Sequence, residues 1–283
     1  MEHALSMKGI SKSFGEKNVL KKIDLEVKSG EIFGLIGPSG AGKTTIIKIL
    51  TGQLKADSGT SVIGGIDSLS LKPEDYGGFG IMMDNFGLYD RLNCCDNLKI
   101  FADIYGLNKN TVHQALSAVG LTGNEKTAAA KLSKGMKSRL RLARALITDP
   151  DILFLDEPTS GLDPASAEDI RQMLLNEKKR GKTIFLTTHN MSEAEKLCDS
   201  IALLLDGGIA EYGSPTEICR RYDHKKTICI HMKNGTDKIL PHSPKSAEAI
   251  AYLLSKDLIE TIHTSEPTLE TVFMELTGKE LAS

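Results

Sequence analysis

Short runs of mostly apolar residues recur along this chain of 283 residues, and most of them are followed directly by a polar or charged residue. Runs of four or five residues that are apolar throughout are typical of parallel strands buried on both faces of a sheet. Three of them are followed by segments with helical spacing, which predicts an alternation of strand and helix and an α/β fold. The runs are residues 32–36, 79–83, 152–155, 183–187 and 201–205, and the helical segments are 45–50, 164–179 and 191–198.

Three regions depart from that alternation. Residues 5–27 alternate apolar and polar positions, which predicts antiparallel strands ahead of the first buried strand. Helical spacing at 96–105, 111–119 and 138–147 predicts a helix-rich insertion. From about residue 214, a mixture of short helices and strands around an Asn234-Gly235 turn predicts a small α+β domain. We therefore expect a domain over 1–213, with a helical subdomain at about 93–147, and a second domain over 214–283.

A glycine-rich stretch lies between the apolar run 32–36 and the helix that follows it, and it matches the P-loop pattern G-x-x-x-x-G-K-[ST]. Its backbone N–H groups and the helix N-terminus are predicted to surround a polyphosphate, with Lys43 adding positive charge and Thr44 giving a hydroxyl to Mg²⁺. The alternative is a glycine-rich turn that matches by accident, which the strand before it and the helix after it disfavour. The predicted ATP-binding residues of the loop are Gly37, Pro38, Ser39, Gly40, Ala41, Gly42, Lys43, Thr44 and Thr45.

Charge and cysteine content narrow the class of protein. The net charge is −2 and no long basic run is present, so we expect no nucleic-acid partner. The five cysteines are odd in number and lack C-x-x-C spacing, which argues against a disulfide framework or a structural zinc site and favours a reducing cytosol. The first residues lack the apolar core of a signal peptide, and the aliphatic run 201–205 is too short to span a bilayer.

Two adjacent carboxylates, Asp156 and Glu157, follow directly after residues 152–155. An isolated acidic pair is usually solvated surface charge, but ligands of parallel sheets bind beyond the carboxyl ends of the strands. Asp156 is therefore predicted to hold Mg²⁺ through a water molecule. Glu157 is predicted to orient and deprotonate the water that attacks the γ-phosphate.

Three other residues are candidates for the nucleotide site, with weaker support from the sequence. Asp84 comes directly after residues 79–83, so it is predicted to reach the nucleotide and the metal. A lone histidine is usually structural, but His189 follows residues 183–187 and is expected at the same edge, where it would donate to the γ-phosphate. Phe14 interrupts the antiparallel strands, where an aromatic residue usually packs; near the P-loop it would stack on an adenine ring.

These residues together resemble the ATP-binding cassette (ABC) ATPases, and the resemblance covers nearly the whole chain. The segment Leu132-Ser133-Lys134-Gly135-Met136 is similar to the signature motif L-S-G-G-Q, and it departs from that motif at Lys134 and Met136. The resemblance implies that Ser133 and Gly135 contact the γ-phosphate held by the opposite subunit. It also implies that Asp163 belongs to the D-loop, His189 is the switch histidine and Phe14 stacks on adenine. The family usually has glutamine where this chain has Asp84, so that loop departs from the pattern.

The family further implies that two copies enclose two ATP molecules head to tail in a two-fold dimer. The signature segment, the residues 86–92 and the ending 266–278 look like the drug- and antibiotic-exporting branch, notably its bacitracin- and lantibiotic-resistance members. That branch carries its membrane part on a separate permease, which would place this chain at the cytoplasmic face of the cell membrane.

The resemblance leaves two alternatives to such a transport ATPase. Soluble ABC ATPases that act on DNA or ribosomes carry a long coiled coil or tandem cassettes, and this chain shows neither a heptad run nor a second P-loop. A regulatory module without hydrolysis is disfavoured by the presence of Glu157 and His189.

Overall fold

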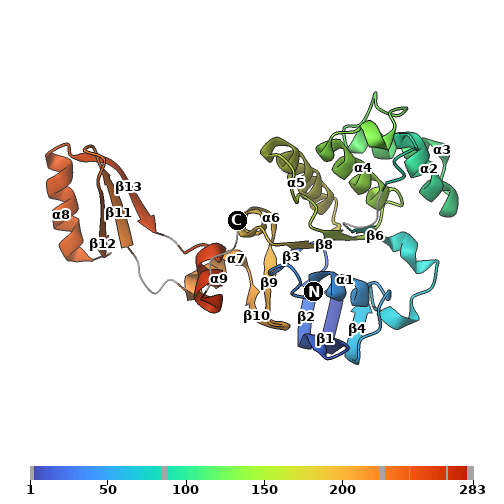
Figure 1. Cartoon of the computed structure of the whole chain (residues 1–283), viewed down its shortest axis with the longest axis horizontal. Coiled ribbons are helices and arrows are strands. Elements are labelled where there is room, and N and C mark those ends of the chain that lie inside the picture. Colours follow the sequence, from blue (N-terminus) through green and yellow to red (C-terminus); the bar gives the residue numbers. More distant parts are fainter. Residues whose placement is uncertain (1–2, 84–87, 223–226, 242, 266, 279–283) are drawn as a thin grey trace. The chain divides into compact units, whose positions relative to one another are not determined.

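The computed structural model describes the whole chain except residues 1–2, 84–87, 223–226, 242, 266 and 279–283 (Figure 1). It divides into two compact units, Met1–Ser214 and Pro215–Ser283. Each unit is described by itself. Within the described residues, no helix is both long enough and apolar enough to cross a membrane.

A six-stranded sheet forms the centre of the first unit, with the order β10-β9-β3-β8-β7-β6. Neighbouring strands from β9 to β6 run parallel, and β10 pairs antiparallel with β9. Every residue of β3, β7 and β8 is buried, as the apolar runs predict. The strands are β3 (Ile32–Ile36), β6 (Phe79–Met82), β7 (Ile152–Asp156), β8 (Thr183–Thr188), β9 (Ser200–Leu205) and β10 (Gly208–Gly213).

Two features of this sheet differ from the sequence predictions. Phe79 and Ile81 are only half-buried, because β6 is at the edge of the sheet and packs fully on one face alone. The strand β10 was not predicted, since its sequence Gly-Ile-Ala-Glu-Tyr-Gly has few apolar residues and a glycine at each end. The strand β10 is stabilised by its hydrogen-bonded pairing with β9 and not by burial of its own side chains.

The predicted antiparallel strands form a second sheet with the order β2-β1-β4-β5. Apolar residues of β2 are buried, including Leu20, Ile23 and Leu25. These side chains share one core with the apolar side of α1 (Lys43–Leu50) and with phenylalanines of the six-stranded sheet. The helix that follows the P-loop is thereby fixed against both sheets. The strands are β1 (His3–Phe14), β2 (Lys17–Lys28), β4 (Ser58–Ile63) and β5 (Ile66–Asp67).

Three helices, α2 (Cys94–Ile104), α3 (Lys109–Ala118) and α4 (Lys134–Leu146), contact one another and form the predicted helical insertion. The helix expected over 138–147 begins earlier than predicted, because the Ser133 hydroxyl accepts the Met136 N–H and caps a polar first turn. Two further helices are α5 (Pro164–Lys179) and α6 (Met191–Leu197), and short 3₁₀ turns are η1 (Ser68–Ser70), η2 (Asp75–Gly78) and η3 (Ala129–Lys131).

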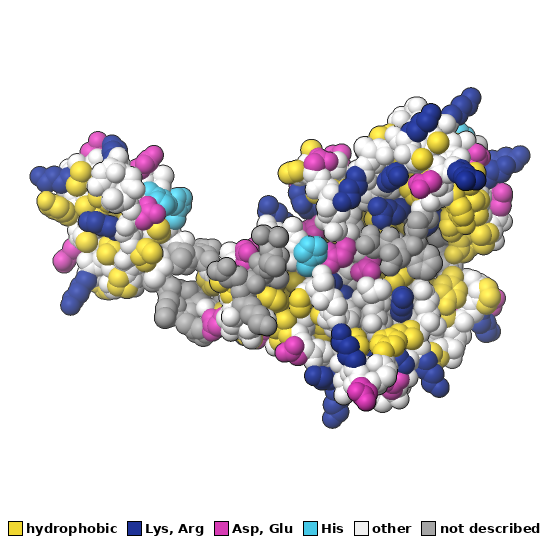
Figure 2. Space-filling model, viewed as in Figure 1, with side chains coloured by type: hydrophobic (Ala, Val, Ile, Leu, Met, Phe, Trp, Pro, Cys, Tyr) yellow, Lys and Arg dark blue, Asp and Glu magenta, His cyan; other side chains and the backbone are white. Residues whose placement is uncertain are grey.

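The second unit contains a three-stranded antiparallel sheet with the order β12-β11-β13. Its buried core is small, with Ile230, Met232 and Leu253 packed together. Histidine side chains gather on its surface (Figure 2), where the rings of His231 and His263 lie with their centroids 5.8 Å apart. The elements are α7 (Pro215–Arg221), β11 (Thr227–Met232), β12 (Asp237–Pro241), α8 (Pro244–Ser255), β13 (Ile259–Ser265) and α9 (Leu269–Thr277).

Candidate functional site

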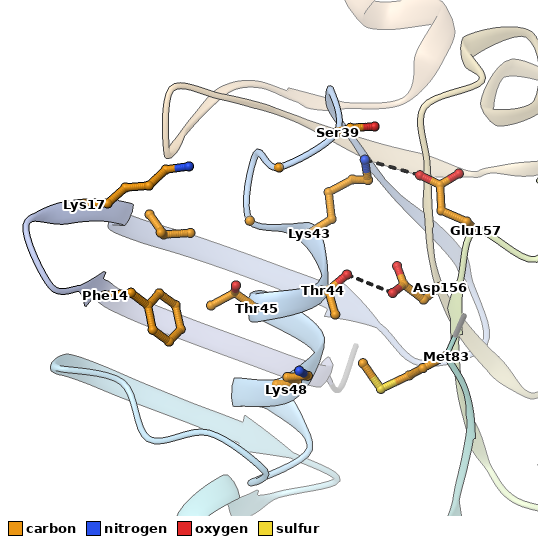
Figure 3. A pocket seen from close by; sticks show the side chains of 13 residues that line it. Phe14, Lys17, Ser39, Lys43, Thr44, Thr45, Lys48, Met83, Asp156 and Glu157 are labelled. Atoms are coloured by element: carbon orange, nitrogen blue, oxygen red, sulfur yellow. Dashed lines mark hydrogen bonds and ion pairs between the residues drawn. The ribbon is translucent and has the colours of Figure 1, made fainter. Parts of the chain in front are cut away.

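A cleft of about 540 Å³ opens where the P-loop, the β1–β2 turn and the end of β7 meet (Figure 3). Its volume falls within the range of pockets that bind small molecules and cofactors. The described residues that line it are Phe14, Lys17, Val19, Ser39, Gly40, Gly42, Lys43, Thr44, Thr45, Lys48, Met83, Asp156 and Glu157.

The P-loop connects β3 to α1, and its glycines are required by geometry. Gly42 has φ of 109° at the start of α1, and a Cβ there would lie 2.9 Å from Leu20 Cδ2. Gly37 does not line the cleft, but a Cβ on it would lie 2.5 Å from the Leu204 carbonyl oxygen. Pro38 and Ala41 also lie outside the cleft lining, and the Ala41 N–H donates to the Pro38 carbonyl at 3.2 Å. These residues shape the loop, while the N–H groups at the start of α1 provide an anion site.

The side chain of Lys43 is only 8% exposed and extends along the loop. Its Nζ donates to the carbonyl oxygen of Gly37 at 2.7 Å and lies 3.3 Å from Glu157 Oε1 (Figure 3). The ammonium group is therefore held beside the place where phosphates would lie, facing the acidic end of β7.

Thr44 and Asp156 meet in the cleft, as the metal prediction requires. The Thr44 hydroxyl donates to Asp156 Oδ2 at 2.8 Å, and the Thr187 hydroxyl donates to Oδ1 at 2.5 Å. Among the described residues, no group of three His, Cys, Asp or Glu side chains could hold a metal by itself. A hydroxyl beside one carboxylate nevertheless fits Mg²⁺, which takes one or two protein ligands and completes its octahedron with water and phosphate oxygens.

Glu157 and His189 are in direct contact at the carboxyl ends of β7 and β8. His189 Nδ1 lies 2.8 Å from Glu157 Oε2, and the Glu157 N–H donates to the Thr187 carbonyl at 3.1 Å. Glu157 has φ of 50°, an uncommon value for a residue with a Cβ, and such residues cluster at functional sites. The carboxylate has 18% exposure, so it is fixed by neighbours and still reaches the cleft.

Two other predicted residues, Phe14 and Asp84, differ in whether the structure describes them. Phe14 lines the cleft and is 51% exposed, with Lys12 Nζ 5.6 Å from its ring centroid. Its exposed ring is suitable for stacking. Asp84, the third predicted metal ligand, lies outside the described residues, and its neighbour Met83 contributes to the cleft.

Among the described residues that line the cleft, none comes from the signature segment. Ser133 is exposed at the start of α4, and Gly135 is buried so closely against α5 that a Cβ would lie 2.4 Å from Ser166 Oγ. Asp163 accepts the Ser166 N–H at 3.0 Å and caps α5; that hydrogen bond lowers the pKa of its carboxyl group. The structure thus brings the P-loop, Asp156, Glu157 and His189 together, and it leaves Ser133, Gly135 and Asp163 outside that group.

Among the described residues that line the cleft, four were not predicted: Lys17, Val19, Lys48 and Met83. Lys48 is one helical turn beyond Thr44 and Thr45, so helical periodicity from the P-loop would have found it. Lys17 and Val19 belong to the strand after Phe14, and only the packing of the two sheets brings them to the loop.

Comparison with known proteins agrees with this geometry. Residues 20–160 match the family model described as ABC transporter. The chain is similar to the fluoroquinolones export ATP-binding protein of Mycobacterium tuberculosis, at 39% identity over 93% of this chain and 88% of that protein. It is also similar to the linearmycin resistance ATP-binding protein of Bacillus subtilis, at 31% identity over 98% and 99%. A dimeric ATP-binding cassette in a post-hydrolysis state, bound to ADP and Pi, matches with a TM-score of 0.67 and 25% identity, over 74% of this chain and 98% of that one.

Proposed function

Because this chain belongs to the ABC transporter family and is an ATPase of that family, we propose that it powers the export of a drug, antibiotic or peptide by a separate membrane permease. The printed names of its relatives, fluoroquinolone export and linearmycin resistance, support export as the direction of transport. The chain would then be bound to the cytoplasmic face of the cell membrane through that permease.

One observation carries the proposal: the carboxylate of Glu157 lies between the Lys43 ammonium group and the His189 ring. Glu157 orients a water molecule and accepts its proton, while Lys43 neutralises charge on the terminal phosphates. His189 donates to the γ-phosphate from the opposite side of the same carboxylate. The exposed face of Phe14 stacks on the adenine ring.

Thr44 and Asp156 are the residues that would hold Mg²⁺, and the metal would balance the negative charge that develops on the phosphate oxygens. The Thr187 hydroxyl keeps the Asp156 carboxylate in place, so the chain presents both oxygen donors in a fixed arrangement.

The site of one chain is incomplete if Ser133 acts on nucleotide, because the described lining of the cleft holds no residue of the signature segment. We infer that a second copy supplies Ser133 and Gly135, and that each copy does the same for the other. A two-fold dimer produces two such shared sites. The similarity to a dimeric cassette bound to ADP and Pi supports this assembly.

Mixing two inactive variants tests the shared site. Ser133→Arg places a bulky charge at the interface and is expected to abolish ATPase activity while ATP still binds the monomer. Lys43→Ala removes the positive charge that would face the phosphates and is expected to lose nucleotide binding. In a dimer of the two variants, one site combines both defects and the other site is sound. Equal mixing should therefore restore about a quarter of the wild-type activity, since about half of the dimers are mixed and each has one sound site.

Two controls make the result decisive. Ser117→Arg puts the same charge on an exposed serine of α3 and should leave activity unchanged. Mixing wild type with Lys43→Ala shows whether a dimer with one sound site hydrolyses ATP. If that mixture is active and the two inactive variants never restore each other, the shared site is wrong.

A further inference from the structure

One buried carboxylate beside the site has no part in the mechanism described so far. Glu193 on α6 is only 2% exposed. Its Oε1 accepts the Thr159 hydroxyl at 2.5 Å, and its Oε2 accepts the Thr188 hydroxyl at 3.0 Å. Each oxygen of the Glu193 carboxyl group thus accepts a hydrogen bond from a threonine hydroxyl.

The two threonines belong to the two segments that carry Glu157 and His189. Thr159 is two residues after Glu157, and Thr188 directly precedes His189. The Glu193 side chain therefore links the turn that follows β7 to the carboxyl end of β8. Thr159 and Thr188 are 29 residues apart in the sequence, and both donate to the Glu193 carboxylate.

Asn190 holds both Glu193 and Thr188 in place. The Asn190 side chain accepts the Glu193 N–H at 3.0 Å and caps α6, and the Asn190 N–H donates to the Thr188 hydroxyl at 3.0 Å. The Thr188 hydroxyl thus joins the Glu193 carboxylate to the backbone of the turn that contains His189. Movement of α6 would shift this turn and the segment after Glu157 together.

Glu157 needs such support because of its backbone. A residue with a Cβ at φ of 50° is strained, and it persists where surrounding contacts fix it. On the cleft side the support is Lys43 and Thr187, and the Glu193–Thr159 hydrogen bond fixes the chain just beyond.

We propose that Glu193 is a positioning residue for ATP hydrolysis, which holds Glu157 and His189 in contact through Thr159 and Thr188. This inference rests on the proposed hydrolysis of ATP at this site. It predicts that loss of the carboxylate lowers turnover and leaves ATP affinity unchanged, since Glu193 is not among the described residues that line the cleft.

Three variants separate positioning from simple stability. Glu193→Ala removes both acceptors, Glu193→Gln keeps one acceptor in the same shape, and Thr159→Val removes one hydroxyl at nearly constant volume. We expect kcat to fall about 10–10²-fold in Glu193→Ala, the range for a misplaced catalytic group, and less in the other two. The Kd for ATP, measured by equilibrium binding, should stay within about 2-fold of wild type for all three variants.

Glu177 provides the matched control, because it is another buried glutamate, on α5, that pairs with Arg180 at 2.7 Å and is not among the described residues that line the cleft. Glu177→Gln should lower the unfolding midpoint and leave kcat unchanged. If Glu193→Ala does not fold, Glu193→Gln and Thr159→Val still test the proposal.

The deciding measurement is Glu193→Gln in the Glu157→Gln background, by single-turnover hydrolysis. If Glu193 acts through Glu157, the second substitution should lower the remaining rate by less than about 2-fold, because coupled residues are not additive. An equal loss in both backgrounds, or a loss of ATP affinity that matches the loss of kcat, would overturn the positioning role. If wild type itself hydrolyses no faster than Lys43→Ala, the proposed function fails instead.

Discussion

The two ends of β7 and β8 carry similar charged residues and use them in opposite ways. At the amino ends, two acids and two bases neutralise one another. Lys182 Nζ lies 2.6 Å from Asp149 Oδ1 and 2.5 Å from the Pro150 carbonyl oxygen. Arg180 reaches Asp149 at 2.8 Å and Glu177 at 2.7 Å. These charges connect the strands to α5 and contribute to stability.

At the carboxyl ends, Asp156 and Glu157 face the cleft with one buried lysine and several hydroxyl groups as neighbours. Each end also has an acidic residue with positive φ, at 52° for Asp149 and 50° for Glu157. The backbone feature is therefore the same, and its use differs because ligands of a parallel sheet bind beyond the carboxyl ends of its strands. Charge that is neutralised internally stabilises the fold, and charge left facing a cleft is available for chemistry.

The largest effect is expected at the carboxyl end. Glu157→Gln should lower ATP turnover by at least about 10²-fold, the scale for loss of a general base. The side chain keeps its shape, so ATP binding should persist and an ATP-bound dimer should accumulate in size-exclusion chromatography. A variant that hydrolyses at the wild-type rate would remove Glu157 from the mechanism and end the contrast between the two ends.

An intermediate effect on stability is expected at the amino end. Lys182→Met keeps the apolar stem and removes hydrogen bonds to Asp149 and Pro150, at an expected cost of about 1–3 kcal/mol. That cost corresponds to about 2–4 °C per kcal/mol in the melting temperature of a unit of this size. ATP turnover, measured below the transition, should be unchanged. Loss of turnover without loss of stability would show that the two ends are coupled.

The smallest effect concerns Asp149, whose pKa is lowered chiefly by the hydrogen bond from Lys182. A lowered pKa in the folded state stabilises the fold above the unfolded value of about 4, and that stability is lost as pH falls through the folded value. Asp149→Asn tolerates the positive φ and should cost less than about 1 kcal/mol, because the carboxylate is 67% exposed and screened. Denaturant unfolding at several pH values should show the difference from wild type at neutral pH and its decrease below about pH 4. A difference that grows in acid would contradict the assignment.

Local sequence was enough to predict most of the described residues that line the cleft. The P-loop and the Asp156-Glu157 pair are contiguous segments, each with its strand beside it, and both are where the sequence places them. The fold class was predicted for the same reason, since β3, β7 and β8 each contain a short apolar run that is buried throughout. Asp84 stays a prediction, because it lies outside the described residues.

The contacts between distant segments could not be predicted in the same way. The hydrogen bond between His189 and Glu157 depends on the parallel register of β7 with β8, in which Asp156 is opposite Thr187. The entry of Lys17 into the cleft depends on how the two sheets pack, and the link from Thr159 to Glu193 depends on where α6 returns to the sheet.

The sequence by itself therefore determined which chemical groups this protein has for binding and cleaving a nucleotide, because a glycine-rich loop and a strand end are shaped by their own residues. Only the tertiary structure decided how those groups support one another. Hydrogen bonds have a range of about 3 Å, so whether two side chains from separate strands meet is set by strand order, register and packing. No sequence pattern within a single segment determines strand order, register or packing between segments.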